Sequence, residues 1–204
     1  MNKICEISSG DFFTQKLKVG TISQHSWKYC KKLVMDKKVL HIGCSDYPLY
    51  HLLDKKETNL HFYLSPFCKE LHGVDINGME EMLKVFHGTY FNSMQQVIDS
   101  GHEYDVILAP NIIEHLENPV AVIELIFKIK FKKLFVLVPN FIVSQQSVYE
   151  KGIFTERIHP DHYCWYSPYT LWNLLRKHMG QLNTKSEMNF FDNQNMISIL
   201  VSNE

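Results

Sequence analysis

A short apolar run that stops at a glycine constrains this chain more than any other feature. Residues 38–46 read Lys-Val-Leu-His-Ile-Gly-Cys-Ser-Asp, so the run from Val39 to Ile42 meets Gly43 and small polar residues. This pattern is typical of a buried parallel strand that opens into a turn lined by backbone groups. Ligands of open α/β sheets bind beyond the carboxyl ends of the strands. The sequence therefore predicts a binding cleft that begins at Gly43.

Further apolar runs that end in polar residues follow along the chain. Runs at 71–76, 89–92, 104–109 and 133–138 are expected to be strands, and the segments 80–86, 95–100 and 120–131 have the character of helices. This alternation predicts an α/β fold with a doubly wound, mostly parallel sheet flanked by helices, in which 104–109 is central. Two last apolar runs, 188–191 and 196–201, predict a closing antiparallel hairpin.

Composition and charge narrow the class of protein. The 204 residues are 45% hydrophobic and 21% charged, which is enough for one domain with a substantial core. Because 21 Lys+Arg nearly balance 22 Asp+Glu, the net charge gives no reason to expect a nucleic-acid partner, and a small-molecule substrate remains open. The absence of a long apolar run and of a signal-peptide core, with five scattered cysteines, predicts a cytoplasmic protein without a membrane span. Monomer and homodimer both remain open.

The second predicted strand ends in Asp75, about 30 residues after the first turn. A carboxylate at this place can accept hydrogen bonds from both hydroxyls of a ribose. The alternative is that Asp75 caps the helix expected from Gly78, because aspartate is a common helix cap. The residues alone leave both roles open. Trp27 and Tyr29, on a helix expected at 21–35, could cover a ligand, but aromatic residues on a helix more often pack in a core or interface, so they are not counted as site residues.

Four of these elements occur in the order found in one enzyme family. They are the glycine turn at 39–46, Gly-Val-Asp at 73–75, Tyr-Asp-Val-Ile at 104–107 with Ile-Ile-Glu-His-Leu-Glu-Asn-Pro at 112–119, and Val-Pro-Asn at 138–140. The chain resembles a class I S-adenosylmethionine-dependent methyltransferase. The resemblance implies a Rossmann-like fold of about seven strands with the last one antiparallel. It also implies S-adenosyl-L-methionine as cofactor and S-adenosyl-L-homocysteine as product.

Two stretches, 41–48 and 159–168, resemble a narrower bacterial branch that is often encoded with capsule or lipopolysaccharide enzymes. This likeness implies O-methylation of a carbohydrate, a sugar nucleotide or a phosphorus-linked substituent in surface polysaccharide biosynthesis. Two alternatives stay open: methylation of another small molecule such as a quinone or amine, and an inactive methyltransferase-like binding module. The resemblance divides the single domain into an N-terminal helical cap (1–36), a cofactor-binding core (37–140), an acceptor-side loop (141–168), and a C-terminal helix and hairpin (169–204).

The resemblance carries cofactor-binding roles onto eight positions. Three residues of the first turn would face the methionine part of the cofactor, one carboxylate would hold the ribose, three residues would lie near the adenine, and one asparagine would approach the methionyl end. In that order they are Gly43, Cys44, Ser45, Asp75, Ile76, Asn92, Ser93 and Asn111. The turn departs from the family because Ser45 and Tyr47 stand where further glycines are common, which narrows the cleft. It lacks the Gly-x-Gly-x-x-Gly that a nicotinamide cofactor needs.

A hydroxyl acceptor would benefit from a general base as well as from alignment with the methyl group. We expect His115, after the strand at 104–109, or His162 to be that base, with Asp161 orienting an imidazole. The alternative is that Glu114 and His115 cap the next helix and that His159, Asp161 and His162 only fasten a loop. The His-x-Asp-His spacing does not define a metal geometry, so no metal site is predicted. The segment 141–160 is expected to be a loop or lid that selects the acceptor.

Overall fold

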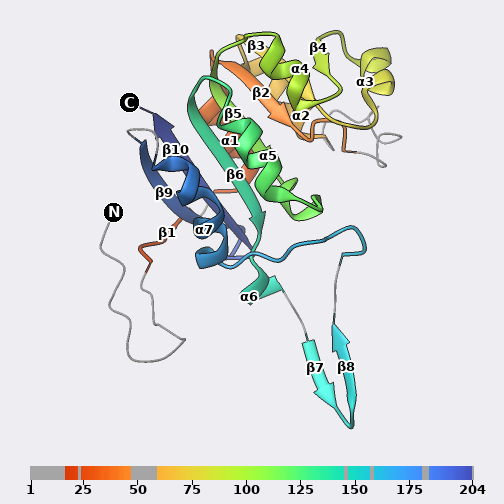
Figure 1. Ribbon diagram of the computed structural model, residues 1–204, viewed down its shortest axis with the longest axis vertical. Helices are drawn as coiled ribbons and strands as arrows, with labels where there is room; N and C mark the ends of the chain where they lie inside the picture. Colours follow the sequence, from red (N-terminus) through yellow and green to blue (C-terminus); the bar gives the residue numbers. More distant parts are fainter. Residues whose placement is uncertain are drawn as a thin grey trace.

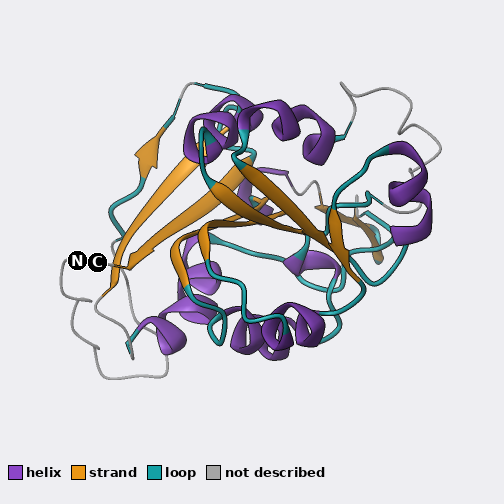
Figure 2. Ribbon diagram, turned by 90° about the horizontal axis from the view of Figure 1, so that it is seen from above, coloured by secondary structure: helices purple, strands orange, loops and turns teal. Residues whose placement is uncertain are grey.

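The computed structural model of the protein describes residues 17–22, 24–46, 59–144, 147–156, 159–180 and 184–203. Most of the strands in these segments belong to a single sheet, with helices on both sides (Figures 1 and 2). The strands of this sheet are β1 (Gly20–Thr21), β2 (Lys38–Ile42), β3 (Glu70–Val74), β4 (Thr89–Phe91), β5 (Tyr104–Pro110), β6 (Phe131–Pro139), β9 (Thr184–Phe191) and β10 (Met196–Asn203).

The order of the strands confirms the predicted doubly wound sheet. It runs β1-β9-β10-β6-β5-β2-β3-β4, with β5 between β2 and β6 as expected for its apolar sequence. The pairs β2·β3, β2·β5, β3·β4 and β5·β6 are parallel, whereas β10 is antiparallel to both β6 and β9. The strands on either side of β2 are therefore reached by crossovers in opposite directions, so a cleft is expected at their carboxyl ends.

Helices connect the strands and cover both faces of the sheet. They are α1 (Ser26–Val34), α2 (Leu60–Leu64), the 3-10 turn η2 (Ser65–Phe67), α3 (Met79–Val85), α4 (Met94–Asp99), the 3-10 turn η3 (Ile113–His115), α5 (Pro119–Ile126), α6 (Phe141–Ser144) and α7 (Pro168–Met179). No helix among the described residues is both long and apolar enough to cross a membrane.

Side chains of the central strands alternate between two buried layers. Leu40 and Ile42 of β2 pack in a cluster with residues of α4, α5 and α7, whereas Val39 packs with residues of α1 and α2. The same alternation holds in β6, where Leu134 and Val136 lie in the first cluster and Phe135 in the second. Because both faces are buried, these strands read in sequence as nearly continuous apolar runs.

Two helix boundaries expected from the sequence need correction. The helix expected at 21–35 begins only at Ser26, because Gly20–Thr21 forms β1 and pairs with β9. The helix expected at 120–131 ends at Ile126, and Phe131 already belongs to β6, where it pairs with Tyr104. Apolar spacing does not separate a helix end from the buried strand that follows it.

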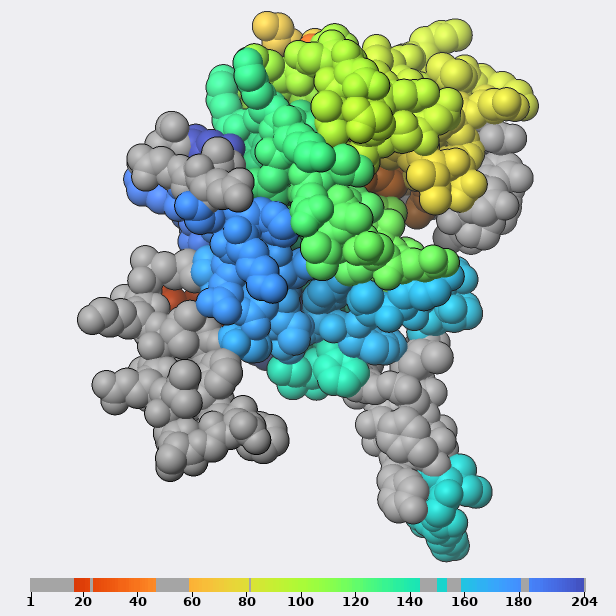
Figure 3. Space-filling view, viewed as in Figure 1, coloured from red at the N-terminus to blue at the C-terminus, as the bar shows by residue number. Residues whose placement is uncertain are grey.

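The segment predicted as a loop, 141–160, has regular structure of its own. It contains α6 and a hairpin of β7 (Ser147–Glu150) and β8 (Ile153–Glu156), which form a two-stranded sheet apart from the main one. The hairpin projects from the body of the molecule (Figures 1 and 3). Its turn residues Lys151 and Gly152 both have positive φ, 53° and 79°, as a two-residue hairpin turn of the mirror-image type requires.

The C-terminal elements follow the predicted pattern. Ser167 caps α7, because its hydroxyl oxygen accepts a hydrogen bond from the Thr170 backbone N–H. The Thr170 hydroxyl oxygen in turn accepts a hydrogen bond from the Ser167 backbone N–H. Pro168 occupies the first helical position, where its missing N–H has no cost. The hairpin of β9 and β10 closes the sheet around the turn at 192–195, as the sequence indicates.

Candidate active site

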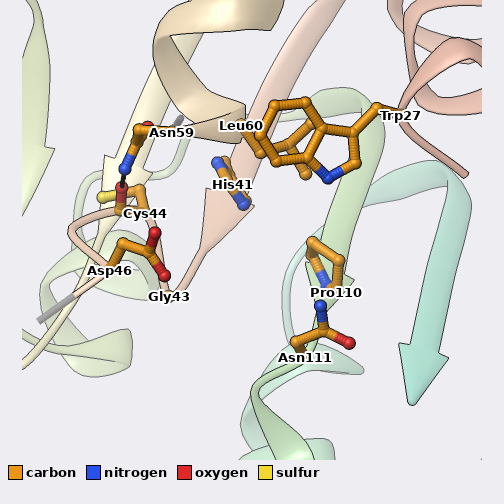
Figure 4. Close-up of a pocket in the computed structure, with 9 residues that line it drawn as sticks. All are labelled: Trp27, His41, Gly43, Cys44, Asp46, Asn59, Leu60, Pro110 and Asn111. Atoms are coloured by element: carbon orange, nitrogen blue, oxygen red, sulfur yellow. Dashed lines mark hydrogen bonds between the residues drawn. The ribbon is translucent and has the colours of Figure 1, made fainter. Parts of the chain in front are cut away.

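A pocket lies at the carboxyl edge of the sheet, where the turn after β2 faces the end of β5. Its residues surround a common space in Figure 4, and its volume is about 80 Å³. Three of the eight predicted cofactor residues line it, and six other residues complete the wall. The lining residues are Gly43, Cys44 and Asn111, together with Trp27, His41, Asp46, Asn59, Leu60 and Pro110.

Gly43 is the residue that lets the chain turn at the end of β2. Its φ is +74°, a conformation that side chains with a Cβ adopt at a cost. A Cβ at this position would lie 2.8 Å from Cδ1 of Ile112, so the turn also packs tightly against the segment that follows β5. The backbone carbonyl of the next residue, Cys44, accepts a hydrogen bond of 3.3 Å from the Asn59 side chain (Figure 4). Tyr47, the second departure from the family glycines, lies outside the described residues.

Asp75 follows β3 and is bound to the same turn. Its Oδ2 accepts hydrogen bonds from the backbone N–H and the hydroxyl of Ser45, at 3.1 and 2.8 Å. Its Oδ1 accepts a bond of 3.3 Å from the Asn77 backbone. The carboxylate does not cap α3, whose N-cap is Gly78 without a side-chain bond. Because a carboxylate offers about four acceptor positions, these three bonds from described residues leave one for a ligand hydroxyl.

The remaining predicted adenine contacts lie at the ends of β3 and β4. Ile76 is 78% exposed, so its side chain is available to a flat ring and is not part of the core. Ser93 has a structural task, because its hydroxyl accepts the Gln96 N–H and caps α4. The Asn92 backbone N–H donates to the Gln96 side chain at 2.8 Å. Thus Ile76 and the Asn92 side chain fit the expected role better than Ser93 does.

The end of β5 adopts a strained backbone between the pocket and the segment after it. Asn111 has φ of +50°, which non-glycine residues rarely adopt and asparagine tolerates best. Its N–H is held by the Leu137 carbonyl of β6 at 2.8 Å. Such outliers persist when surrounding bonds enforce them, and they concentrate at functional sites. Asn111 therefore marks the point where the chain leaves the pocket and enters η3.

Two buried histidines form part of the pocket wall and its support. His41 of β2 and His61 of α2 approach within 3.3 Å through their Nδ1 atoms, and their rings stack with centroids 5.4 Å apart. Burial lowers the pKa of His41 to about 4. Burial, together with the charge that a protonated His41 would carry, lowers the pKa of His61 well below its usual range. Both imidazoles are therefore neutral at pH 7, and one Nδ1 must donate its proton to the other.

The structure brings together three histidines from distant parts of the chain, which we call the histidine cluster: His115, His159 and His162. Ring centroids lie 4.7 Å apart for His115 and His162, 4.7 Å for His159 and His162, and 5.6 Å for His115 and His159. Burial is the main cause that lowers the pKa of His162, to about 4, and of His115. The positive charge that a neighbouring imidazole would carry lowers both pKa values further.

The predicted orienting residue, Asp161, acts through a different atom from the one expected. Its carboxylate is 66% exposed and comes no closer to His159 Nδ1 than 4.0 Å. Its backbone carbonyl instead lies 3.1 Å from Nδ1 of His115. Because a carbonyl can only accept, His115 carries its proton on Nδ1 and keeps a lone pair on Nε2. The sequence predicted that the Asp161 carboxylate would orient an imidazole. In the structure the turn at 159–162 points the Asp161 backbone carbonyl toward His115 instead.

Backbone bonds fasten the two segments of the cluster. The Glu114 carbonyl accepts the N–H groups of Tyr163 and Cys164, at 2.9 and 3.1 Å. The Glu114 side chain is 1% exposed, both of its oxygens are without a partner among the described residues, and burial raises its pKa to about 8. Glu114 is therefore an uncharged carboxylic acid at pH 7. Neither Glu114 nor His115 caps the next helix, because the N-cap of α5 is Asn118.

The histidine cluster lies beside the pocket. Asn111 lines the pocket and is followed within four residues by His115. The carboxylate of Asp46, also in the pocket wall, has a pKa raised by burial and by Asp75, and the His115 charge counteracts this. The interaction of Asp46 with His115 places the cluster within electrostatic reach of the turn after β2. The pocket and the histidine cluster thus meet at one edge of the sheet.

Sequence reasoning missed six of the lining residues. Trp27 lies on α1, in which only Ser26, Cys30 and Val34 are buried, and an aromatic residue on a helix more often packs than contacts a ligand. His41 lies on β2 among buried residues, so the sequence carries no signal that distinguishes it from the core. Asp46 could have been found, because it belongs to the same polar turn as Gly43. Asn59 appears in sequence only as a polar residue before α2, and its role as a cap and a bond donor to the turn depends on the fold.

No protein-family model and no curated protein matches the chain. Among solved structures, the small RNA methyltransferase HEN1 superposes on 94% of this chain with a TM-score of 0.60 and 15% identity. A SAM dependent methyltransferase from Aquifex aeolicus covers 88% with a TM-score of 0.55 and 11% identity. An S-adenosylmethionine dependent methyltransferase from Mesorhizobium loti covers 87% with a TM-score of 0.53 and 11% identity.

These structures differ in length from the present chain. The chain spans 90% of the Aquifex protein and 95% of the Mesorhizobium protein, but 27% of HEN1 and 40% of a matching chain in the Pnkp1/Rnl/Hen1 RNA repair complex. At 11 to 15% identity the likeness concerns the fold. The protein has the class I fold of S-adenosylmethionine-dependent methyltransferases.

Proposed function

We propose that this protein is an S-adenosylmethionine-dependent methyltransferase that methylates a hydroxyl of a carbohydrate, a sugar nucleotide or a phosphorus-linked substituent in surface polysaccharide biosynthesis. One observation supports it most: the Gly43 turn, the Asp75 carboxylate and Asn111 converge at the edge of the sheet beside the histidine cluster. The combination suits a cofactor with a ribose and an acceptor that must lose a proton.

The residues present fit the cofactor. Asp75 has an acceptor position left for a ribose hydroxyl, and displacing the Ser45 hydroxyl would free a second one. A pocket of about 80 Å³ is smaller than the roughly 300 Å³ of a typical small ligand site, so it would hold only the methionine end. The nucleoside would then extend past Asp75 toward Ile76. When bound, the cofactor supplies an electrophilic methyl group on a sulfonium.

The protein's own contribution is to hold the acceptor and to take its proton. His115 presents the lone pair of Nε2, because the Asp161 carbonyl fixes the proton on Nδ1. His162 lies against it with a neutral ring. A positioned base of this kind typically contributes about a hundredfold or more to the rate. The hairpin β7–β8 and the segment 159–166 would form the acceptor side.

A second candidate acceptor is an RNA. It is favoured by the extent of the likeness to HEN1, a small RNA methyltransferase, although that likeness concerns the fold. The net charge of −1 argues against it, since RNA binding usually requires a basic surface. A quinone or an amine would need no sugar-binding surface, and an inactive binding module would transfer no methyl group to any acceptor.

Transfer of a labelled methyl group would test the proposal. The purified protein is incubated with methyl-labelled S-adenosyl-L-methionine and a panel of sugar nucleotides, capsule oligosaccharides, short RNAs, quinones and amines. We expect label in a carbohydrate product. The rate of labelling should fall about a hundredfold or more in His115→Gln and stay unchanged in His87→Gln, because His87 is an exposed histidine outside the histidine cluster. Label only in RNA, quinone or amine would replace the proposed acceptor. Cofactor binding without transfer to any of these classes would favour the inactive module.

A further inference from the structure

The nitrogen atoms of the histidine cluster are arranged as the ligands of a metal ion. One ring nitrogen from each of His115, His159 and His162 lies within 4.8 Å of the others. In a tetrahedral site with metal–nitrogen distances of about 2.0–2.1 Å, neighbouring nitrogens are about 3.4 Å apart. Small rotations of the three side chains would bring the nitrogens to that spacing. We propose that the histidine cluster binds a divalent transition-metal ion, of which zinc is the type, with a fourth coordination position left open.

The hydrogen bonding around His115 supports this site. A histidine that binds a metal usually donates its other ring N–H to a carbonyl or carboxylate, which fixes the ring and its tautomer. His115 does this through Nδ1 and the Asp161 carbonyl at 3.1 Å, so Nε2 is the free ligand atom. The Asp161 carboxylate, which the sequence predicted to orient an imidazole, is 66% exposed. The third imidazole comes instead from η3, which the local spacing His-x-Asp-His does not include.

His162 provides a second and independent observation. Its Nδ1 is buried and has no hydrogen-bond partner among the described residues. Buried polar atoms are nearly always paired, so an unpaired ring nitrogen at the centre of a cluster calls for a ligand. The ring is held in place by stacking on His159 and by an edge contact with Trp165, whose ring centroid is 5.3 Å away.

The two segments are joined by the backbone bonds from Tyr163 and Cys164 to the Glu114 carbonyl. Two of the imidazoles also bond to the turn at 159–162, because His115 Nδ1 lies 3.1 Å from the Asp161 carbonyl and His159 Nδ1 accepts the Asp161 N–H at 3.3 Å. These bonds use Nδ1 in both rings and do not involve Nε2. Three neutral nitrogen ligands favour zinc, copper, nickel or iron(II) over magnesium and calcium, which prefer oxygen.

The exposure of the cluster indicates an open site. His159 has 53% of its side chain exposed, and the other two members are partly buried, so solvent or a substrate can reach the ion. Structural zinc sites have four protein ligands, whereas catalytic sites have three and keep one position for water or substrate. At the acceptor side, an ion would lower the pKa of a bound hydroxyl, a role that rests on the proposed function. The free imidazole base would then be replaced by the ion.

Cobalt titration tests the site without the acceptor. The protein, freed of any affinity tag and dialysed against a chelator, is titrated with Co²⁺ while visible absorption is recorded, and Zn²⁺ is titrated by calorimetry. We expect one equivalent per chain with the strong bands of four-coordinate Co²⁺, and a change of these bands when azide occupies the open position. His115→Ala and His162→Ala should each weaken binding by more than about a hundredfold, since loss of a ligand exceeds the 10–100-fold effect of outer-shell partners. His87→Ala is the matched control, and circular dichroism verifies folding.

Absence of stoichiometric binding, or binding that all three single alanine variants of the cluster retain, would overturn the proposed site. Bands that azide leaves unchanged would overturn the open position. Binding of S-adenosyl-L-homocysteine is measured separately on the metal-free protein. Metal binding without cofactor binding would support the metal site and refute the proposed function. Cofactor binding without metal binding would refute the metal site and leave the proposed function standing.

Discussion

The buried pair of His41 and His61 should make the protein lose stability in mild acid. In the unfolded chain both histidines have a pKa near 6.5, whereas burial lowers the pKa of His41 to about 4 in the folded protein. Between these values the unfolded state binds protons that the folded state does not. The stabilising contribution is therefore complete above pH 6.5 and is lost as the pH falls toward 4.

The size of this effect follows from the shift. A fall from 6.5 to about 4 corresponds to about 3 kcal/mol for His41, at about 1.4 kcal/mol per pH unit. The pKa of His61 is also lowered, which adds in the same direction. The total stability of a domain is only about 5–15 kcal/mol, so the loss is a large fraction of it. Urea unfolding followed by circular dichroism should show a midpoint lower by about 1 M at pH 4.5 than at pH 7.

A double variant separates this pair from other titrating groups. His41→Leu with His61→Leu removes both polar partners together, so neither is left buried and unpaired. We expect the difference in midpoint between pH 7 and pH 4.5 to shrink in the double variant and to persist in His87→Gln, the exposed control. If the double variant and the parent lose stability in parallel over this range, the argument from the buried pair is wrong.

Three other substitutions test single positions. Gly43→Ala should destabilise the protein by about 1–2 kcal/mol and weaken cofactor binding, because φ is +74° and the new Cβ would meet Ile112. Thermal unfolding measures the stability and calorimetry measures the binding. An unchanged melting temperature would contradict the prediction. Gly73→Ala should also lower the melting temperature, since its Cβ would lie 2.5 Å from the Cys44 sulfur; a melting temperature equal to the parent's would show that β3 has room. Ser167→Ala should cost about 1 kcal/mol and lower the melting temperature by about 2–4 °C through loss of the α7 cap, and no change would mean that the cap contributes nothing.

The order of the sheet was predictable because its central strands are buried on both faces. Such strands leave apolar runs, as at Val39 to Ile42 and in β5, that end in glycine or polar residues where the cleft lies. The start of α7 was predictable from Ser167 and Pro168, because a helix cap is a local signal. The hairpin β7–β8 was missed, although Lys151-Gly152 lies between two short segments that contain β-branched and aromatic residues, which is a pattern of a two-residue hairpin turn.

The candidate site was less predictable because its parts are distant in sequence. Asp75 and Gly43 follow strand ends, so sequence order places them at one edge, but the bond from Ser45 to Asp75 depends on the register of β2 against β3. His115 and Asp161 are 46 residues apart, and their contact uses a backbone carbonyl that no side-chain pattern reveals. Position in sequence could therefore identify the histidines, and only the fold could show that three of them meet.

Calorimetric binding of S-adenosyl-L-homocysteine tests the central claim most directly. The parent protein is titrated beside Asp75→Ala, which removes the proposed ribose anchor at a strand end, and Asp99→Ala, an exposed aspartate at the end of α4, serves as the matched control. We predict saturable binding with one site per chain, retained in Asp99→Ala and weakened at least tenfold in Asp75→Ala, because a charge-assisted bond contributes about 1.5–3 kcal/mol. No binding at millimolar ligand, or equal affinity of the parent and Asp75→Ala, would contradict the account.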